Sequence, residues 1–340
     1  MAPLPAADLE EVLRRTGPLW AHAKGSRFLV TGGSGFIGRW LVESLLLAND
    51  AGGLGASVAV LSRNSDAFLR AAPHLAENPA LTVLPGDVRT FEAPPGSFSW
   101  VLHLAFDSSR PSGADETRDV ILRGTENVLR IAKERHAARL LLLSSGAVYG
   151  PQPPDLDLVP ETFQGQPADA YGEAKRKAER MAVDAAGNGG LEVVVARGFA
   201  FVGALLPLGA HFAIGNFIGD ALAGRPVRVT GDGTQIRSYL YAADLAVWLL
   251  TILFRGRPSA AYNVGSEEAV SIEALARTVA RVLAPSLPVT VARRPAPGPA
   301  ARYVPATRRA REELGLDAAV GLEEAITRTG RWYSEHRPSR

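Results

Sequence analysis

The chain has 340 residues, a length that favours one large α/β domain or two domains sharing an interface. Its 37 basic and 35 acidic residues leave a net charge of +2, which is too small for a protein whose main partner is nucleic acid. Cysteine is absent, which excludes disulfides, thiolate nucleophiles and cysteine-ligated metal sites, and only four basic residues are lysines: Lys24, Lys133, Lys175 and Lys177.

The first 26 residues carry an amphipathic pattern. Leu9, Val12 and Leu13 recur at helical spacing, which predicts a helical appendage over residues 8–23, ahead of the first strand. Acidic residues interrupt this stretch, so we expect no secretory signal. No apolar run in the chain is long enough to span a membrane. We therefore expect a soluble, cytoplasmic protein.

From residue 27 onward, short apolar strands alternate with longer helical stretches. The predicted strands are 28–31, 58–61, 81–83, 100–104, 140–143 and 193–196. This alternation predicts βαβ units in an α/β fold, with a doubly wound parallel sheet over residues 27–200. Between the first two strands, Gly52, Gly53 and Gly55 predict a flexible insertion.

After residue 200 the rhythm changes to glycine-rich and proline-rich loops. Helices are predicted near 213–223 and 242–255, with a proline-rich connector at 285–299. This pattern predicts a smaller C-terminal lobe over residues 201–340. Segments near 240–265 are expected to return to the sheet domain.

The segment 28–38 runs from an apolar strand through G-x-x-G-x-x-G into a helix. Gly32 suits a tight turn, Gly35 lets backbone approach a pyrophosphate, and Gly38 allows close packing of helix on strand. The phosphates would bind the N–H groups of the first helical turn. The residues expected at this phosphate site are Gly32, Gly35, Phe36, Ile37 and Gly38. The alternative interpretation is a glycine-rich turn that binds nothing.

The end of the second strand bears on the choice of cofactor. Folds that prefer NAD place an acid there to bond the ribose hydroxyls, whereas an arginine suits a 2′-phosphate. Here the sequence is Ser62-Arg63-Asn64, so NADP is favoured over NAD, unless Arg63 is merely a solvated surface residue. Asp87, followed by Val88, could receive an adenine amino group or simply form a turn.

A strand-end serine and a helical tyrosine–lysine pair form the candidate catalytic set. Ser145 follows the strand 140–143, and Tyr171 comes 26 residues later, with Lys175 one helical turn beyond it. A tyrosine hydroxyl titrates at about pH 10, so an adjacent ammonium is needed to bring its proton transfer toward neutral pH. Ser145 would then hold the substrate oxygen. A chance pair on a helix surface is the alternative, and the upstream dinucleotide loop disfavours it.

Two competing chemistries lack their motifs. Gly33-Ser34-Gly35 is not the G-x-S-x-G frame of a serine hydrolase, because Phe36 occupies the last position. The six histidines form no i, i+4 pair and no HExxH motif, so no metal site is expected.

Together these residues resemble the extended short-chain dehydrogenase/reductase family, which contains nucleotide-sugar epimerases, dehydratases, decarboxylases and 4-ketoreductases. The resemblance extends from about Arg27 to about Tyr333. Further matching segments are His103-Leu104-Ala105, 124–128, Gly231-Asp232-Gly233, 237–241 and Tyr262-Asn263-Val264-Gly265. The resemblance implies a Rossmann-type NAD(P)-binding domain and a C-terminal lobe that binds a nucleoside diphosphate sugar.

The resemblance also assigns roles to residues. It implies that Ser145, Tyr171 and Lys175 are catalytic and that Tyr171 and Lys175 also contact the cofactor. Arg237 would grip the diphosphate, which suits a guanidinium fork, although a surface salt bridge with Asp232 or Asp244 is its alternative. The remaining implied binding residues are Leu104 and Ala105 for the cofactor, and Asn216 and Arg302 for the substrate. Relatives also imply a homodimer, paired through the helices at 116–134 and 170–186.

Departures from the family pattern reduce the number of reactions that the sequence supports. Dehydratases place Asp-Glu directly after the catalytic hydroxyl residue, and decarboxylases place a glutamate at the second of these positions. Here they are Gly146 and Ala147, which cannot transfer a proton, so both reactions are disfavoured. A 4-ketoreductase or an NAD-dependent 4-epimerase remains, and Arg63 favours reduction of a 4-keto-deoxyhexose by NADPH. A cofactor-binding regulator without turnover is the non-enzyme alternative.

Overall fold

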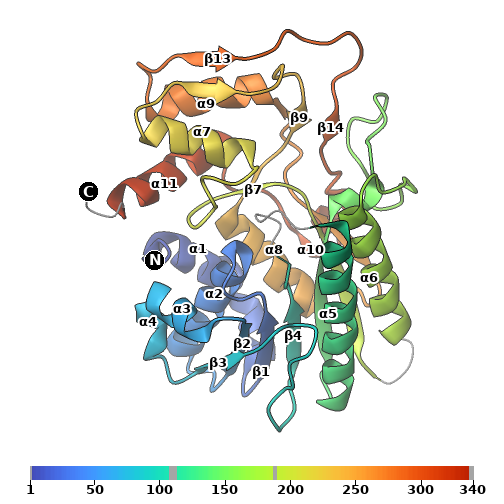
Figure 1. The fold of residues 1–340 in the computed structure, drawn as a ribbon. Coiled ribbons are helices and arrows are strands. Elements are labelled where there is room, and N and C mark those ends of the chain that lie inside the picture. Colours follow the sequence, from blue (N-terminus) through green and yellow to red (C-terminus); the bar gives the residue numbers. More distant parts are fainter. Residues whose placement is uncertain (1, 107–112, 187–189, 337–340) are drawn as a thin grey trace.

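Seven parallel strands form the central sheet of the computed structural model, which describes residues 2–106, 113–186 and 190–336. Their order is β11-β6-β5-β4-β1-β2-β3 (Figure 1). The strands are β1 (Arg27–Thr31), β2 (Ser57–Ser62), β3 (Leu81–Pro85), β4 (Trp100–His103), β5 (Arg139–Ser145), β6 (Glu192–Gly198) and β11 (Ala261–Val264). The six strands predicted before residue 200 are confirmed, and with them the α/β, Rossmann-type fold.

Helices cover both faces of this sheet, and alternate side chains of each strand pack against them. Leu29 of β1 joins the apolar cluster formed with α5 and α6, whereas its neighbour Val30 joins the cluster formed with α2 and α8. These helices are α2 (Phe36–Gly52), α5 (Ala114–Glu134), α6 (Ala170–Ala186) and α8 (Ala242–Arg255). The core is therefore divided into two layers, one on each side of the sheet.

The direction of winding reverses at β1. The chain adds β2 and β3 on one side of β1, and β4, β5 and β6 on the other. At such a switch point the loops at the carboxyl ends of the strands diverge and leave a crevice for a ligand. Two short helices, α3 (Ser65–Ala71) and α4 (Pro73–Ala76), follow β2.

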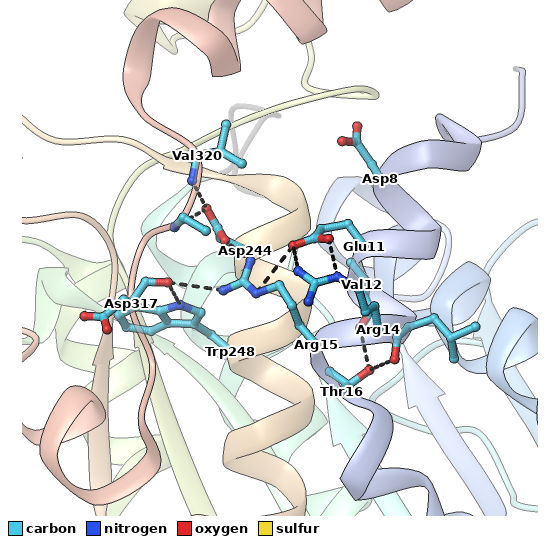
Figure 2. Close-up of polar contacts among 12 residues, drawn as sticks. Asp8, Glu11, Val12, Arg14, Arg15, Thr16, Asp244, Trp248, Asp317 and Val320 are labelled. Atoms are coloured by element: carbon cyan, nitrogen blue, oxygen red, sulfur yellow. Dashed lines mark hydrogen bonds and ion pairs between the residues drawn. The ribbon is translucent and has the colours of Figure 1, made fainter.

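The N-terminal appendage is an α-helix, α1 (Ala6–Arg15), followed by a 3-10 helix, η1 (Gly17–Ala23). The prediction of one continuous helix is wrong, because Gly17 and Pro18 interrupt the regular hydrogen bonding. Figure 2 shows Arg15 pairing with Asp244 of α8, which also accepts the backbone N–H of Val320 at 3.0 Å. The appendage is thus tied to the sheet domain and to the C-terminal segment.

A second lobe lies above the carboxyl ends of the strands (Figure 1). Its helices are α7 (Ala213–Leu222), α9 (Ile272–Leu283) and α11 (Leu322–Glu335), and α10 (Arg308–Leu314) lies against β11. The small sheets pair β7 (Phe201–Val202) with β10 (Leu240–Tyr241), β8 (Val227–Val229) with β13 (Val289–Val291), and β9 (Ile236–Arg237) with both β12 (Val270–Ser271) and β14 (Arg302–Tyr303). The helices predicted near 213–223 and 242–255 are confirmed.

Two loop predictions need correction. The glycines at 52–55 form no flexible insertion: Gly52 ends α2, and Gly53, with φ of 55°, caps it by donating its N–H to Asn49. The proline-rich connector contains β13, which pairs with β8.

Among the helices of the described ranges, none is long and apolar enough to cross a bilayer.

The packing of α2 on β1 depends on one missing side chain. A Cβ at Gly38 would lie 2.2 Å from the carbonyl oxygen of Gly32 and 2.5 Å from the Cα of Gly33, and backbone atoms do not move aside cheaply. We expect Gly38→Ala to lower the free energy of unfolding by at least about 2 kcal/mol, measured by denaturant titration. Gly17→Ala, where a Cβ meets no atom within 4 Å, is the control. Equal stability of both variants would contradict this account.

Candidate active site

A cleft of about 1210 Å³ opens at the switch point, between the carboxyl ends of the strands and the second lobe. Its walls come from the glycine loop, the ends of β2, β3, β4 and β5, the start of α6, and β9 and β14 of the second lobe. Within the part of the chain that the structure describes, no group of His, Asp and Glu is arranged to hold a metal ion.

The glycine loop forms a cradle for a pyrophosphate. Gly32 has φ of 76°, and a Cβ there would lie 2.8 to 2.9 Å from the backbone of Leu104 and Ala105, so only glycine fits. α2 starts after Gly35 with no side chain capping its first N–H groups. These donors, together with the positive end of a 17-residue helix, suit the phosphates of a dinucleotide. The chain therefore fits a nicotinamide cofactor at this position.

The structure brings most of the predicted cofactor residues to this cleft. Those that line it are Gly32, Gly35, Phe36, Ile37, Gly38, Ser62, Arg63, Asp87, Val88, Leu104, Ala105, Tyr171 and Lys175. Asn64 is not among them, because its side chain caps α3 by accepting the N–H of Ala67 at 2.9 Å. The role given to Asn64 thus lacks structural support.

Asp87 is held by a neighbour in the same turn. Arg89 donates to both carboxylate oxygens of Asp87, at 2.9 and 2.8 Å, and this hydrogen bonding lowers the pKa of the carboxyl group. Arg89 also pairs with Glu116 and Asp119 on α5. Asp87 is therefore an ionised acceptor in the cleft wall, consistent with either the adenine contact or the turn role.

The three candidate catalytic residues meet in the middle of the cleft. Ser145 ends β5, while Tyr171 and Lys175 project from the first two turns of α6. Lys175 is buried, and its Nζ donates to the carbonyl oxygen of Leu143 at 2.9 Å. The ring of Phe106 stacks on Tyr171 with 5.1 Å between centroids. Two elements distant in sequence thus place a hydroxyl pair and an ammonium together.

Burial shifts the titration of both helical residues. It raises the pKa of Tyr171, against the opposing effect of the Ser145 side chain, so Tyr171 carries its proton at neutral pH. Burial therefore outweighs the lowering of the Tyr171 pKa expected from Lys175, whose Nζ donates to Leu143 and lies 5.9 Å from the centroid of the Tyr171 ring. Burial also lowers the pKa of Lys175 to about 8, with Glu179 acting in the opposite direction.

Tyr303 also lines this part of the cleft, and the sequence motifs did not predict it. Its hydroxyl lies 3.4 Å from Oγ of Ser145 and 3.5 Å from the carbonyl oxygen of Gly198, and its ring lies 4.6 Å from that of Phe199. Burial raises the pKa of Tyr303 well above its usual value. Nothing in the local sequence marks this tyrosine, since it lies in β14, 158 residues beyond Ser145.

The predicted substrate residues do not all reach the cleft. Arg237 lines it, with its guanidinium carbon 5.7 Å from the ring centroid of Tyr303. Among the described residues no carboxylate pairs with Arg237: Asp232 accepts from Thr234, and Asp244 pairs with Arg15. The alternative prediction, in which Arg237 forms a surface salt bridge with Asp232 or Asp244, is therefore wrong.

Asn216 and Arg302 do not line the cleft in this structure. From α7, only Ala213 and Ile214 reach its wall. Arg302 instead turns toward Asp157, with 3.4 Å between Nη2 and Oδ1. Contact of either residue with substrate therefore has no support from the geometry.

His103 is buried beneath the cofactor cleft at the end of β4. Its ring nitrogens lie 2.8 Å from Oγ1 of Thr31 and 3.2 Å from Oγ1 of Thr125. Burial, and next the charge of Lys175, lower the pKa of His103 to about 3. The imidazole is therefore neutral in the folded protein at physiological pH.

Comparison with known proteins agrees with this geometry. The chain belongs to the NAD dependent epimerase/dehydratase family, whose model matches residues 28–265. The resemblance to extended short-chain dehydrogenases/reductases is thereby confirmed, and the protein is an enzyme of their nucleotide-sugar group.

Particular relatives differ in reaction. UDP-glucuronic acid decarboxylase 1 of Arabidopsis thaliana is 31% identical over 324 residues, which cover 92% of this chain and 72% of the relative. Among solved structures, UDP-glucose 4-epimerase of Thermotoga maritima, with UDP-glucose, matches with a TM-score of 0.76, 22% identity and coverage of 91% and 99% of the two chains. A dTDP-glucose 4,6-dehydratase of Streptomyces venezuelae with NAD bound matches with a TM-score of 0.75 and 24% identity. The match covers 92% of this chain and 98% of that structure's chain. These two structures show the shared fold.

The buried histidine predicts an acid sensitivity. In the unfolded chain His103 binds a proton below its ordinary pKa of 6.5, whereas the folded protein does so only near 3, so stability falls as pH decreases between these values. The slope from this residue is about 1.4 kcal/mol per pH unit. We expect His103→Gln to flatten the pH dependence of the unfolding free energy between pH 6.5 and 5. His22→Gln, at an exposed site, should keep the wild-type slope.

Proposed function

We propose that the protein reduces the C4 ketone of a nucleotide-activated 4-keto-deoxyhexose with NADPH. The observation that carries this proposal is the absence of room for a second acid beside Ser145. A Cβ at Gly146 would lie 2.6 Å from the hydroxyl of Tyr303 and 2.8 Å from ring atoms of Phe199. An acidic residue like that of a dehydratase therefore does not fit there, and the next residue is Ala147.

The acidic residues that do line the cleft are already paired. Of the described residues that line the cleft, Asp87 and Glu116 are the acidic ones, and Arg89 pairs with both. The hydroxyl groups of Tyr171 and Tyr303 remain near Ser145, and we assign proton transfer to Tyr171 because Lys175 follows it one turn later on α6. One hydroxyl acid is sufficient for ketone reduction, whereas dehydration and decarboxylation require further groups.

The residues of the site divide this reaction between them. Ser145 donates a hydrogen bond to the carbonyl oxygen, and a nicotinamide held in the cleft would supply the hydride for the carbonyl carbon. As the carbonyl π bond breaks, Tyr171 transfers its phenolic proton to the oxygen and completes the hydroxyl group. The Lys175 ammonium stabilises the phenolate left on Tyr171, which then takes a proton from solvent.

The walls of the substrate side support a deoxysugar. Phe199, Tyr303 and Ala147 present aromatic and methyl surface close to Ser145, which suits a sugar carbon that has lost its hydroxyl group. Arg237, free of a carboxylate partner among the described residues, supports binding of the diphosphate. The serine–arginine–asparagine end of β2 supports NADPH, because it offers no acid to the ribose hydroxyls.

The acid is tested first. We expect Tyr171→Phe to lower kcat by about 100-fold to 10,000-fold, because the proton donor is lost, while NADPH binding persists. NADPH oxidation at 340 nm with a nucleotide 4-keto-deoxyhexose measures the rate, and fluorescence titration measures binding. Tyr262→Phe, in β11 outside the cleft wall, should retain turnover. Wild-type activity in Tyr171→Phe would disprove the assignment.

Incubation with different substrates separates reduction from epimerisation at C4. A reductase consumes one NADPH for each 4-keto sugar, and it leaves a nucleotide hexose unchanged when no cofactor is added. Interconversion of nucleotide hexoses without net NADPH oxidation would instead establish the 4-epimerase. Mass spectrometry and NMR of the products distinguish the two results.

The lowered pKa of Lys175 predicts a basic limb in the pH profile. Above pH 8 the free enzyme loses the ammonium that assists Tyr171, so kcat/KM for NADPH should fall about tenfold per pH unit. Lys175→Arg keeps its charge at these pH values, so its residual activity should lack this limb. A wild-type profile that is flat from pH 7 to 10 would contradict this role of Lys175.

A further inference from the structure

Arg39 is a buried cation in the cofactor cleft to which the proposed reaction gives no task. It follows Gly38 directly, in the first turn of α2, where its N–H donates to Gly35 at 2.9 Å. Arg39 contributes to the cleft wall although its side chain is almost wholly buried. This placement brings a guanidinium next to the phosphate cradle.

The guanidinium is only partly satisfied. Nε of Arg39 donates to Oε1 of Glu43 at 2.9 Å, and Nη2 donates to the same oxygen. Nη1 is buried and has no hydrogen-bond partner. Because a buried, unpaired donor on a charged group is costly, a free Nη1 indicates an acceptor that the protein itself does not supply.

The surroundings of Arg39 hold this guanidinium in place. Its Cζ lies 5.8 Å from the ring centroid of Phe68 in α3. Glu43 is fixed in turn, because its Oε2 accepts the backbone N–H of Leu4 at 3.1 Å and lies 3.3 Å from Nε2 of His74 in α4. The guanidinium is thus held between α2 and the α3–α4 segment that follows β2.

That position matches one part of a dinucleotide. In doubly wound folds, residues that follow the second strand contact the ribose of the adenosine half. Arg63, exposed at the end of β2, lines the same cleft as Arg39. Neither Ser62 nor Asn64 brings a negative charge to this corner, and Asn64 is occupied as the cap of α3.

We propose that Arg39 and Arg63 together form the binding site for the 2′-phosphate of NADPH. Nη1 of Arg39 donates to the phosphate from the buried side, and Arg63 contacts it from the solvent side, as paired guanidinium groups commonly bind phosphate. Glu43 positions the Arg39 guanidinium without contacting the cofactor. This inference rests on the NADPH preference in the proposed function. It adds Arg39 as a buried residue that binds the 2′-phosphate.

Binding of two cofactor fragments tests the site without turnover. Isothermal titration of the full chain with adenosine 2′,5′-bisphosphate and with 5′-AMP isolates the contribution of the 2′-phosphate. We expect wild type to prefer the bisphosphate at least tenfold. Arg39→Met should weaken bisphosphate binding by about 10-fold to 100-fold and leave 5′-AMP binding within about twofold. Arg70→Met, which removes an exposed charge of the neighbouring helix α3, should leave both affinities unchanged.

A second variant separates recognition from damage to the fold. Arg39→Met alone leaves the buried Glu43 carboxylate without its main partner, so the double variant Arg39→Met with Glu43→Gln removes both charges together. Thermal melts establish that the double variant is folded, and it should show the same selective loss of bisphosphate affinity.

The contrary outcomes are distinguishable. Equal loss of both fragments in the Arg39 variants, with a wild-type preference for the bisphosphate, would overturn the role of Arg39 and leave the NADPH preference intact. Equal wild-type affinity for both fragments would overturn the NADPH preference and this site with it. Ketone reduction would then be examined with NADH.

Discussion

The largely buried ion pair between Glu179 and Arg197 holds helix α6 to the sheet. Nη2 of Arg197, in β6, lies 2.7 Å from Oε2 of Glu179, while Oε1 of Glu179 accepts the hydroxyl of Ser144, the neighbour of Ser145. Removal of one charge would leave the other buried and unpaired, which is strongly destabilising. This single pair therefore sets the distance between the end of β5 and the helix that carries Tyr171.

The same arginine extends the constraint to the second lobe. Arg197 donates to the hydroxyl of Tyr149 at 2.8 Å, and that hydroxyl donates to Asn263 of β11 at 2.7 Å. The amide of Asn263 in turn donates to Val159 and Ala306, on loops that lead to the substrate side. A network of satisfied buried polar groups specifies one arrangement, because every alternative leaves some of them unpaired.

The N-terminal appendage also contributes buried polar contacts between distant segments. Asp8 is buried, accepts the hydroxyl of Tyr241 at 2.5 Å and pairs with Arg328 of α11 at 2.8 Å. The backbone N–H of Leu4 donates a hydrogen bond to the carboxylate of Glu43, which also accepts from Arg39. The appendage is therefore part of the core that fixes the lobe and one wall of the cofactor cleft, although its sequence predicted only a helical appendage. Relatives with other reactions share this fold, so the reaction class depends on a few side chains in the cleft.

The sequence alone determined the fold class and part of the candidate site, because these features depend on interactions between residues close together in the chain. The strands, the glycine loop and the Tyr171–Lys175 pair depend on periodicity and on steric rules that act within a few residues. Tyr303, Arg39 and the exclusion of an acid at position 146 depend on contacts between distant segments, which local patterns do not encode. The sequence also predicted three binding residues that do not line the cleft: Asn64, Asn216 and Arg302. Contacts elsewhere hold the side chains of Asn64 and Arg302, and the path of the chain keeps Asn216 out of the cleft wall. Only tertiary packing decided which polar groups face the cleft and how burial shifts their pKa values, because both depend on neighbours from other parts of the chain.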